Sequence, residues 1–258
     1  MKLEISVSLT YRLPEPVDLM LQVEAASGGG QHVESASLDL GEPELFSRVP
    51  ASDGTCEPVW MRTSGMLRAA YRATVAIDRP MVDFRALPEV PLHRLPAAAV
   101  PYLNESRYCP SNKFHAFVER RFGERTGGAK IGAMRDWIES RFTYVAGAST
   151  SDTGALDSFV ERRGVCRDYA HVMIALARSA HIPARMASVY ALGVKPQDFH
   201  AVAEVYLAGD WHMVDATGMT RPTETARICV GRDAADIAFL TAYREIELVE
   251  QTVRVEKA

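Results

Sequence analysis

At residues 164–171 the chain reads Gly-Val-Cys-Arg-Asp-Tyr-Ala-His, and an apolar run with helical spacing follows. Gly164 ends the segment before it, so Cys166 falls in the first turn of the next helix. Backbone N–H groups point outward at that end of a helix, and the helix dipole is positive there. Both effects favour a thiolate, the nucleophilic form of cysteine. Cys166 is therefore the strongest candidate for a reactive residue.

A nucleophilic cysteine needs an imidazole base and a group that orients the imidazole. His200 is the candidate base, and it follows Cys166 by 34 residues. Asp215 is the candidate orienting group, and it follows His200 by 15 residues. On this pattern alone, a paired strand histidine and a turn aspartate explain the two residues equally well.

The composition is that of an ordinary globular protein. The 258 residues are 47% hydrophobic and 24% charged, with a formal net charge of -4, which allows a proper core. The pI near 6.0 gives no electrostatic reason to expect a nucleic acid or an anionic membrane as partner. No apolar run approaches the ~20 residues that span a bilayer. Residues 1–7 alternate like a strand and lack the features of a signal peptide, so we expect a cytoplasmic protein.

The four cysteines lie far apart, and none forms a Cys-x-x-Cys pair. In a chain of this size without an export signal, that spacing predicts free thiols rather than disulfides. Cys56, Cys109 and Cys229 lack the context of a helix start. We expect each of them to be a small buried or loop residue.

The first part of the chain has the alternation of β-strands. Apolar residues alternate with polar ones over 3–11 and 67–77, which predicts a small antiparallel sheet or sandwich. Gly28-Gly29-Gly30 predicts a turn or a flexible connection. Six of the 14 prolines fall between residues 79 and 110, which predicts an extended linker. The predicted domains are a β-rich domain with this linker over 1–100 and a core over 101–258.

Helical spacing dominates the first half of the predicted core. Helices are predicted over 111–123, 129–142, 155–163 and 166–180, and strands over 184–192, 200–207 and 211–215. A helix over 234–243 and a strand over 247–255 follow. Helices followed by an antiparallel sheet make the chain α+β.

Three motifs occur in a recognisable order. Gly-Val-Cys-Arg-Asp-Tyr-Ala-His, then His-Ala-x-x-Glu-Val-Tyr-Leu, then Trp-x-x-x-Asp-Ala-Thr resembles the transglutaminase-like (transglutaminase core) superfamily. The resemblance is to a bacterial branch described as cysteine proteases. It is tightest over 141–217, including Tyr144 and the loop 148–151. The β-rich N-terminus is similar to the accessory domain of that branch.

The resemblance implies a papain/transglutaminase-like core, with the nucleophile at a helix N-terminus packed on an antiparallel sheet. It implies that Cys166 is the nucleophile, His200 the general base and Asp215 the orienting partner. Many members carry Trp where this chain has Val202, which changes the wall beside the histidine but removes no catalytic atom. We expect no cofactor and no metal.

The implied reaction is acyl transfer through a thioester on Cys166. We prefer hydrolysis of a peptide or protein amide, because the sequence has no cluster of acidic ligands for the calcium that animal transglutaminases use. Three alternatives remain: transglutaminase activity, arylamine N-acetyltransferase-like transfer to an amine, and a non-catalytic binding or scaffold protein. The loops 144–153 and 193–199 shape the pocket, and the sequence does not define the substrate.

The hairpin that joins His200 to Asp215 poses a geometric problem. If residues 209–210 form a two-residue turn, Asp215 faces Glu204. His200 then lies four residues further along the strand, about 13 Å away. We therefore predict a bulge, a strong twist or a longer loop within 201–210. Glu204 is interpreted as a strand partner rather than an acid.

The polar neighbours of the cysteine have simpler interpretations. Asp168 complements the helix dipole, and Arg167 is a surface arginine rather than a ligand for a substrate carboxylate. His171 lies about 140° around the helix from Cys166. A zinc site made of Cys166, His171 and His200 is therefore unfavourable.

Overall fold

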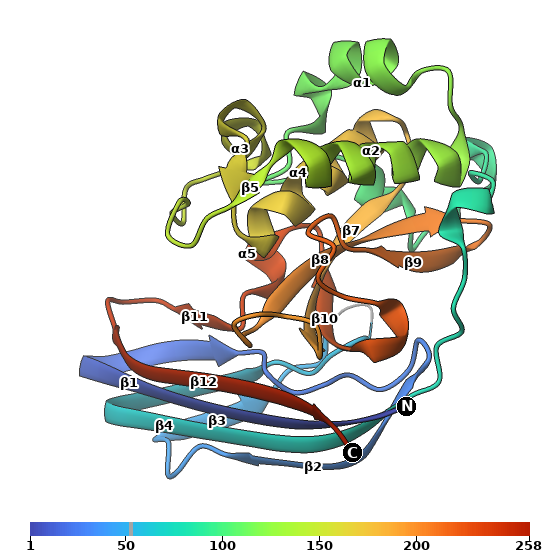
Figure 1. Ribbon diagram of the computed structural model, residues 1–258. Helices are drawn as coiled ribbons and strands as arrows, with labels where there is room; N and C mark the ends of the chain where they lie inside the picture. The colour runs from blue at the N-terminus through green and yellow to red at the C-terminus, as the bar shows by residue number, and fades with distance from the viewer. Residues whose placement is uncertain (52–53) are drawn as a thin grey trace.

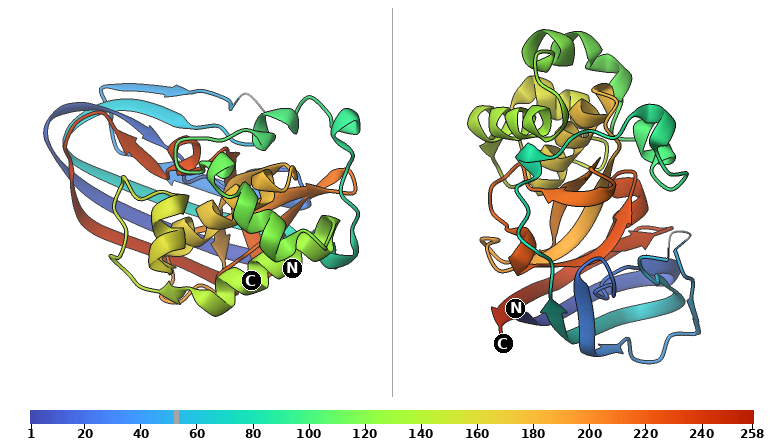
Figure 2. Two further views of the ribbon diagram at one scale, coloured as in Figure 1. Left: turned by 90° about the horizontal axis from the view of Figure 1, so that it is seen from above. Right: turned by 90° about the vertical axis from the view of Figure 1, so that its right-hand side faces the viewer.

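The computed structural model describes residues 1–51 and 54–258. Figures 1 and 2 show three successive layers: helices, a four-stranded sheet and a six-stranded sheet. The four-stranded sheet lies in the middle. The α+β class predicted from the sequence is confirmed. Within the described residues, no helix is long and apolar enough to cross a membrane.

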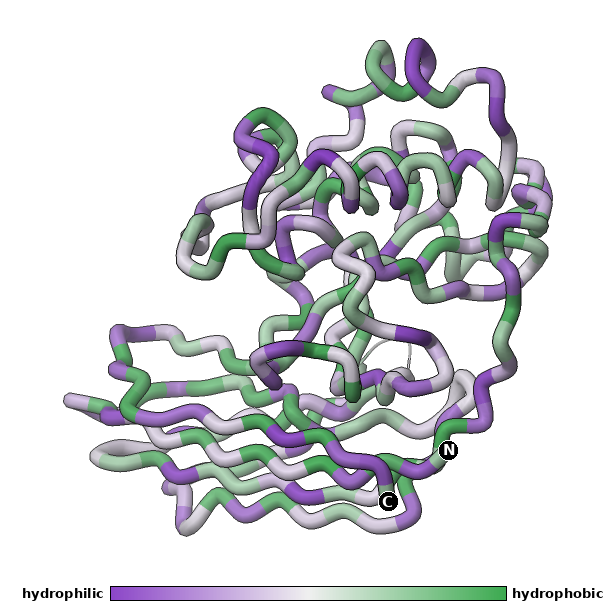
Figure 3. The backbone as a smooth tube through the Cα atoms, in the orientation of Figure 1, coloured by the Kyte–Doolittle hydropathy of each residue, from purple (hydrophilic) through white to green (hydrophobic). Residues whose placement is uncertain are grey.

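The six-stranded sheet is built on two long antiparallel strands, β1 (Lys2–Leu21) and β4 (Val59–Ile77). Most alternate residues of both strands are buried, as expected when one face of a sheet is covered. Figure 3 shows this alternation along the strands as hydrophobic and hydrophilic bands. Strands β2 (Gln31–Asp39) and β3 (Leu45–Arg48) pair with β4, and β11 (Leu240–Ala242) and β12 (Glu247–Lys257) pair with β1.

The C-terminal strand thus completes the N-terminal sheet. It pairs with β1 from Leu3–Lys257 to Arg12–Glu247. The sequence grouped this strand with the core, because an alternating pattern predicts a strand but does not name its partner.

The predicted helix over 234–243 is mostly wrong. Helix α5 spans only Ala234–Ile237, and the chain is extended at β11. The three residues of β11 pair with Leu19, Met20 and Leu21 of β1. Backbone pairing with an existing strand satisfies their hydrogen bonds and overrides the local helical pattern.

The middle sheet has the strand order β10-β7-β8-β9 and is antiparallel. Its strands are β7 (Ala184–Ala191), β8 (His200–Leu207), β9 (Asp210–Val214) and β10 (Thr225–Gly231). The first three agree with the sequence analysis to within one residue at each end, whereas β10 was not predicted.

The helical layer lies over this sheet (Figure 1). It consists of α1 (His115–Phe122), α2 (Gly127–Arg141), α3 (Ala155–Glu161) and α4 (Cys166–Ser179). Helix α4 is buried from Asp168 to Ser179 and packs against β7 and β8. Short parallel strands, β5 (Thr143–Tyr144) and β6 (Arg163–Gly164), pair just before α4.

The proline-rich linker is extended, with short turns of 3-10 helix. These are η1 (Phe84–Ala86), η2 (Leu92–Arg94), η3 (Val100–Leu103) and η4 (Ser111–Lys113), and a further turn, η5 (Pro222–Glu224), precedes β10. Proline lacks a backbone donor, which is why longer elements do not form here.

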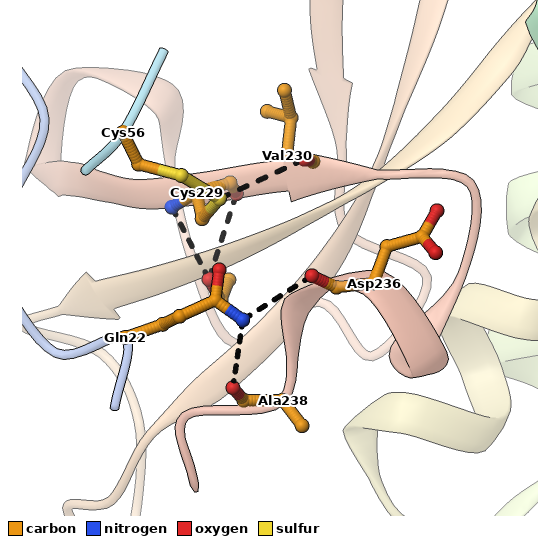
Figure 4. Close-up of a disulfide and its surroundings, with 7 residues drawn as sticks. Gln22, Cys56, Cys229, Val230, Asp236 and Ala238 are labelled. Atoms are coloured by element: carbon orange, nitrogen blue, oxygen red, sulfur yellow. Dashed lines mark hydrogen bonds between the residues drawn. A yellow bond between two sulfur atoms is a disulfide. The ribbon is translucent and has the colours of Figure 1, made fainter. Parts of the chain in front are cut away.

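The two sheets are tied together by hydrogen bonds and ring packing. The Tyr190 hydroxyl donates to the carbonyl oxygen of Val23 at 2.6 Å, and its ring stacks on Tyr71 with centroids 6.4 Å apart. The side-chain amide of Gln22 donates to the carbonyls of Asp236 and Ala238, at 3.2 and 3.1 Å (Figure 4). The N-terminal sheet is therefore packed directly on the core.

A disulfide also joins the sheets. Cys56, in the segment before β4, is bonded to Cys229 of β10 (Figure 4), while Cys109 and Cys166 are free. The prediction that Cys56 and Cys229 are free thiols is therefore wrong. The two residues are 173 positions apart, so no local spacing could have paired them.

Candidate active site

Cys166 is the first residue of α4. The start of the helix is fixed by Asp168, whose Oδ2 accepts a hydrogen bond from the backbone N–H of Val165 at 2.8 Å. Gly164 permits this approach, because a Cβ at that position would lie 2.5 Å from Asp168 Oδ2. Asp168 is fully buried, whereas Cys166 is only half-buried. The motif around the cysteine therefore builds a helix start that leaves the thiol accessible.

His200 begins β8, and Asp215 follows β9. Their side chains meet, with Nε2 of His200 3.1 Å from Oδ2 of Asp215. Both side chains are buried, with exposed fractions of 0% and 6%. The thiol of Cys166 lies close enough to the same imidazole to raise its pKa. The structure thus brings together the three residues that the sequence singled out.

The hairpin between these two residues is regular, so the irregularity predicted within 201–210 is wrong. Its two-residue turn is Ala208-Gly209, one residue earlier than assumed. Both turn residues have positive φ, 52° and 92°, as a type I′ turn requires. Alanine rarely adopts such a φ, so this turn could not be predicted from the residue types. The earlier turn reduces the offset along the strands between His200 and Asp215 from four residues to two.

Asp215 is held by several hydrogen bonds. Its Oδ1 accepts from the backbone N–H and the hydroxyl of Thr217, at 2.8 and 2.7 Å, and its Oδ2 accepts from the N–H of Thr220 at 3.0 Å. Burial raises the pKa of Asp215, but the bond to His200, the charge of His200 and Thr217 together lower it below its ordinary value. Thr217 was not assigned a role from the sequence. The signal for it was the Asp-x-Thr spacing, in which an aspartate accepts from the backbone two residues later.

His200 is surrounded by groups that favour its protonated form. Burial lowers the pKa of His200, but the hydrogen bond to Asp215 and the influence of the nearby Cys166 and Asp215 charges outweigh it. The net effect raises the pKa of His200 to about 10. An imidazolium beside the thiol stabilises a thiolate through charge.

Tyr144 approaches Cys166 from the segment before it. In the short parallel pair β5/β6, Tyr144 lies opposite Gly164, and the N–H of Val145 donates to the Gly164 carbonyl at 2.9 Å. The Tyr144 hydroxyl interacts with both the thiol and the backbone N–H of Cys166. Burial and the charge of Cys166 raise the pKa of Tyr144 to about 12, so its hydroxyl keeps a proton to donate at neutral pH.

Comparisons with known proteins show which family the chain resembles. A family model of the transglutaminase-like superfamily matches residues 104–216, which include Cys166, His200 and Asp215. The crystal structure of a protein from Cytophaga hutchinsonii, named a putative cysteine protease, is 33% identical to this chain. The match covers 99% of this chain and 90% of that one, with a TM-score of 0.92. The chain belongs to the transglutaminase-like superfamily.

A second relative is an uncharacterized protein of Mycobacterium leprae (strain TN), 28% identical over 147 residues. Those residues are 54% of this chain and 53% of the relative. The chain therefore matches about half the length of that curated relative.

The position at which many superfamily members carry Trp is filled here by a buried valine. Val202 is 1% exposed and packs in a small cluster with Ala187, Val189, Met213 and Val230. The residue is therefore part of the buried packing of the middle sheet.

Arg167 supports the loop between β5 and α3. Its Nη2 donates to Ser149 Oγ at 3.1 Å and to the Thr150 carbonyl at 2.8 Å. The sequence interpreted Arg167 as a surface arginine, but these bonds connect the residue after the cysteine to a loop expected to shape the substrate pocket.

His171 contributes to the packing of the core rather than to the candidate active site. It is fully buried, accepts a hydrogen bond from the Ala234 N–H at 3.2 Å, and stacks on Tyr108. Burial lowers the pKa of His171 to about 3, so the ring is neutral. Within residues 1–51 and 54–258, no group of three or more His, Cys, Asp or Glu side chains is placed to hold a metal ion.

Glu204 is more than the strand partner that the sequence indicated. It is fully buried between two arginines, with Oε2 2.8 Å from Arg185 Nε and Oε1 2.6 Å from Arg227 Nη2. The arginines lie 19 and 23 residues away in the chain, so no short motif could have indicated this triad of charges.

Proposed function

We propose that the protein is a cysteine-dependent acyl-transfer enzyme that hydrolyses a peptide or protein amide. The observation that carries this proposal is the buried His200–Asp215 pair beside a half-buried thiol. Nucleophilic cysteine catalysis requires these three groups in contact. The 33% identity to a protein named a putative cysteine protease supports the same reaction class.

In the first step, the Cys166 thiolate attacks the carbonyl carbon of the substrate amide. A carbon–sulfur bond forms, and the carbonyl electron pair moves onto oxygen. When the tetrahedral intermediate collapses, the carbon–nitrogen bond breaks and the His200 imidazolium protonates the leaving amine. The products of this step are a thioester on Cys166, a free amine and a neutral His200.

In the second step, neutral His200 takes a proton from water, which attacks the thioester carbonyl. Collapse breaks the carbon–sulfur bond, releases the carboxylic acid and restores the thiolate–imidazolium pair. Asp215 does not need to accept a proton. Its carboxylate holds the ring orientation and stabilises the imidazolium in both steps.

Two donors are available for the negative oxygen of each tetrahedral intermediate. The backbone N–H of Cys166 lies in the first turn of α4, where no helix carbonyl accepts from it. The Tyr144 hydroxyl interacts with that same N–H and with the thiol. We assign the Tyr144 hydroxyl as the second donor, because it lies next to the reacting sulfur and retains its proton at neutral pH.

The proposal is tested by measuring how fast iodoacetamide alkylates Cys166 as a function of pH, with mass mapping to separate Cys166 from Cys109. Fast alkylation near pH 6 that is lost in His200→Ala supports the thiolate–imidazolium pair. A single titration at the pH of an ordinary thiol, unchanged in His200→Ala, contradicts it and favours a scaffold protein.

The reaction class is tested separately with peptide amides and glutamine-containing peptides, each with and without an added primary amine. Hydrolysis releases a carboxylic acid whether or not the amine is present, and Cys166→Ala abolishes it. A product that appears only with the amine identifies a transglutaminase. An acetyl adduct on Cys166 after incubation with acetyl-coenzyme A identifies an N-acetyltransferase-like enzyme.

A further inference from the structure

A cavity of about 530 Å³ lies where the six-stranded sheet, the linker and the core meet. The linker leaves the N-terminal sheet and rises to the helical layer along this side, shown in teal in Figure 1. Neither Cys166 nor His200 lines the cavity, and of the three proposed catalytic residues only Asp215 does. The mechanism above makes no use of this space.

Five arginines line the cavity: Arg79, Arg85, Arg135, Arg185 and Arg227. Two of them, Arg85 on η1 and Arg135 on α2, are neutralised by carboxylates on α2. Arg85 binds Asp136 through two bonds of 2.9 and 2.7 Å, and Arg135 binds Glu139 through its two terminal nitrogens. The other three arginines, Arg79, Arg185 and Arg227, have no carboxylate of their own. We call the part of the cavity that they line its inner end.

The inner end has more positive than negative charge. Arg185 and Arg227 share a single carboxylate, that of Glu204. Arg79 donates to neutral groups instead: its Nη1 binds the carbonyls of Pro222 and Thr225, at 2.7 and 3.1 Å. Three guanidinium groups therefore face one carboxylate. Glu204 itself does not line the cavity, and the carboxylates that do are those of Asp210 and of Asp215, which is bound by His200.

Burial and the charge of Arg227 lower the pKa of Arg79 to about 10. The positive charges at the inner end thus repel one another without full compensation. A negatively charged ligand would relieve this repulsion, and a guanidinium matches the geometry of carboxylate and phosphate oxygens.

One donor at the inner end has no partner. The side chain of Arg227 is 9% exposed, and its Nε is fully buried with no hydrogen-bond partner among the described residues. The glycine turn predicted at 28–30 lies against the same guanidinium. A Cβ on Gly29, whose φ is +59°, would lie 2.4 Å from Arg227 Nη1. The turn therefore gives the guanidinium room that a larger residue would remove.

We propose that this cavity, which we call the arginine cavity, binds a small polyanion bearing phosphate or several carboxylates. Its volume lies within the range of about 300–1,000 Å³ that is typical of small-molecule sites. Met81 and Val82 on the linker also line the cavity and are exposed, which provides apolar contacts for the organic part of such a ligand. The proposal does not depend on the chemistry of Cys166.

The test is calorimetric titration of the full chain with inorganic phosphate, pyrophosphate and citrate, each at constant ionic strength. We expect saturable binding of one ligand per chain. Tighter binding of pyrophosphate than of citrate would identify a phosphate ligand, and the reverse order a polycarboxylate. If none of the three binds saturably up to about 10 mM, the proposal is wrong.

The site is located with a charge placed at the mouth of the cavity. Val82→Glu adds a carboxylate where the native side chain is 43% exposed, and Met66→Glu adds the same charge on β4, where the side chain is 41% exposed. We expect Val82→Glu to weaken binding about fivefold through repulsion and Met66→Glu to leave it unchanged. Equal effects of both variants would show that binding is non-specific and would overturn the assignment. Unchanged thermal unfolding without ligand confirms that both variants are folded.

Discussion

Strand β8 carries two buried charged groups, His200 and Glu204, four residues apart. Their surroundings differ in kind. His200 contacts one carboxylate, that of Asp215, and its imidazole lies near the thiol of Cys166. Glu204 lies between two guanidinium groups, which keep their protons at neutral pH. The first arrangement leaves a proton that can move. The second satisfies a carboxylate and holds three strands together, since Arg185 lies on β7 and Arg227 on β10.

This difference shows that burial of a charged group does not by itself indicate a catalytic role. Both systems are desolvated, and in both the partners outweigh desolvation. Only the system with a titrating partner and a half-exposed reactive atom supports chemistry. Mutations should therefore separate the two systems, with loss of activity at one and loss of stability at the other.

The largest effect is expected for Asp215→Asn. An amide keeps the approximate shape but does not stabilise an imidazolium, so the rate of Cys166 acylation should fall by ~10⁴-fold. Unfolding in urea should change far less, because the amide oxygen can still accept the two hydrogen bonds from Thr217. Acylation by a peptide amide, followed by intact mass, is the measurement. An activity near that of the wild type would remove Asp215 from the mechanism.

The second-largest effect, a loss of stability, is expected for Glu204→Gln. Two guanidinium groups would lose their shared charge, and breaking a buried ion pair from one side typically costs about 3–5 kcal/mol of unfolding free energy. Urea unfolding monitored by circular dichroism measures this loss. The matched control is Glu247→Gln, which breaks the exposed pair with Arg12 and should have little effect.

If Glu204→Gln lowered iodoacetamide reactivity of Cys166 as strongly as Asp215→Asn while leaving stability intact, the contrast between the two systems would fail. The expected result is the reverse: folded Glu204→Gln keeps the pH dependence of the thiol.

A smaller effect is expected in the pH dependence of stability, which should have two separate limbs. His200 has a folded pKa of about 10, raised from 6.5. It binds its proton more tightly when folded, so its contribution is complete below pH 6.5 and is lost as pH rises through about 10. Glu204 is the opposite case. Burial raises its pKa, but Arg227 and Arg185 lower it below 4.5, so its contribution is complete above pH 4.5 and is lost as pH falls further.

Urea unfolding at a series of pH values distinguishes the limbs. His200→Gln should flatten the alkaline limb and leave the acidic one, and Glu204→Gln should flatten part of the acidic limb only. An alkaline limb that survives in His200→Gln would show that another group is responsible for it.

The sequence indicated the three candidate reacting groups because their signals are local. A glycine before a helix start identified Cys166, and short motifs identified His200 and Asp215. The contact between these two was not derivable, because it depends on a turn with positive φ at Ala208, which alanine does not signal.

Long-range pairings were not derivable either. Three such contacts join residues that are distant in the chain. They are the disulfide between Cys56 and Cys229, the ion pairs of Glu204 with Arg185 and Arg227, and the pairing of β11 with β1. Local periodicity carries information about one element and not about its partner.

The smallest effect is expected for Tyr144→Phe. This variant tests whether Tyr144 takes part in the reaction together with His200 and Asp215. Removing one donor to a developing oxyanion costs about 10²-fold in acylation rate in comparable sites. The ring of Tyr144 lies 6.0 Å from that of Tyr169, and phenylalanine keeps this packing, so stability should be unchanged. Because the thiolate–imidazolium pair does not need the hydroxyl, alkylation by iodoacetamide near pH 6 should be almost unaffected. Acylation by an amide should be slow in the same variant. If both rates fell together, Tyr144 would be stabilising the thiolate rather than the oxyanion, and its role would lie with the charge of Cys166 instead of with the transition state.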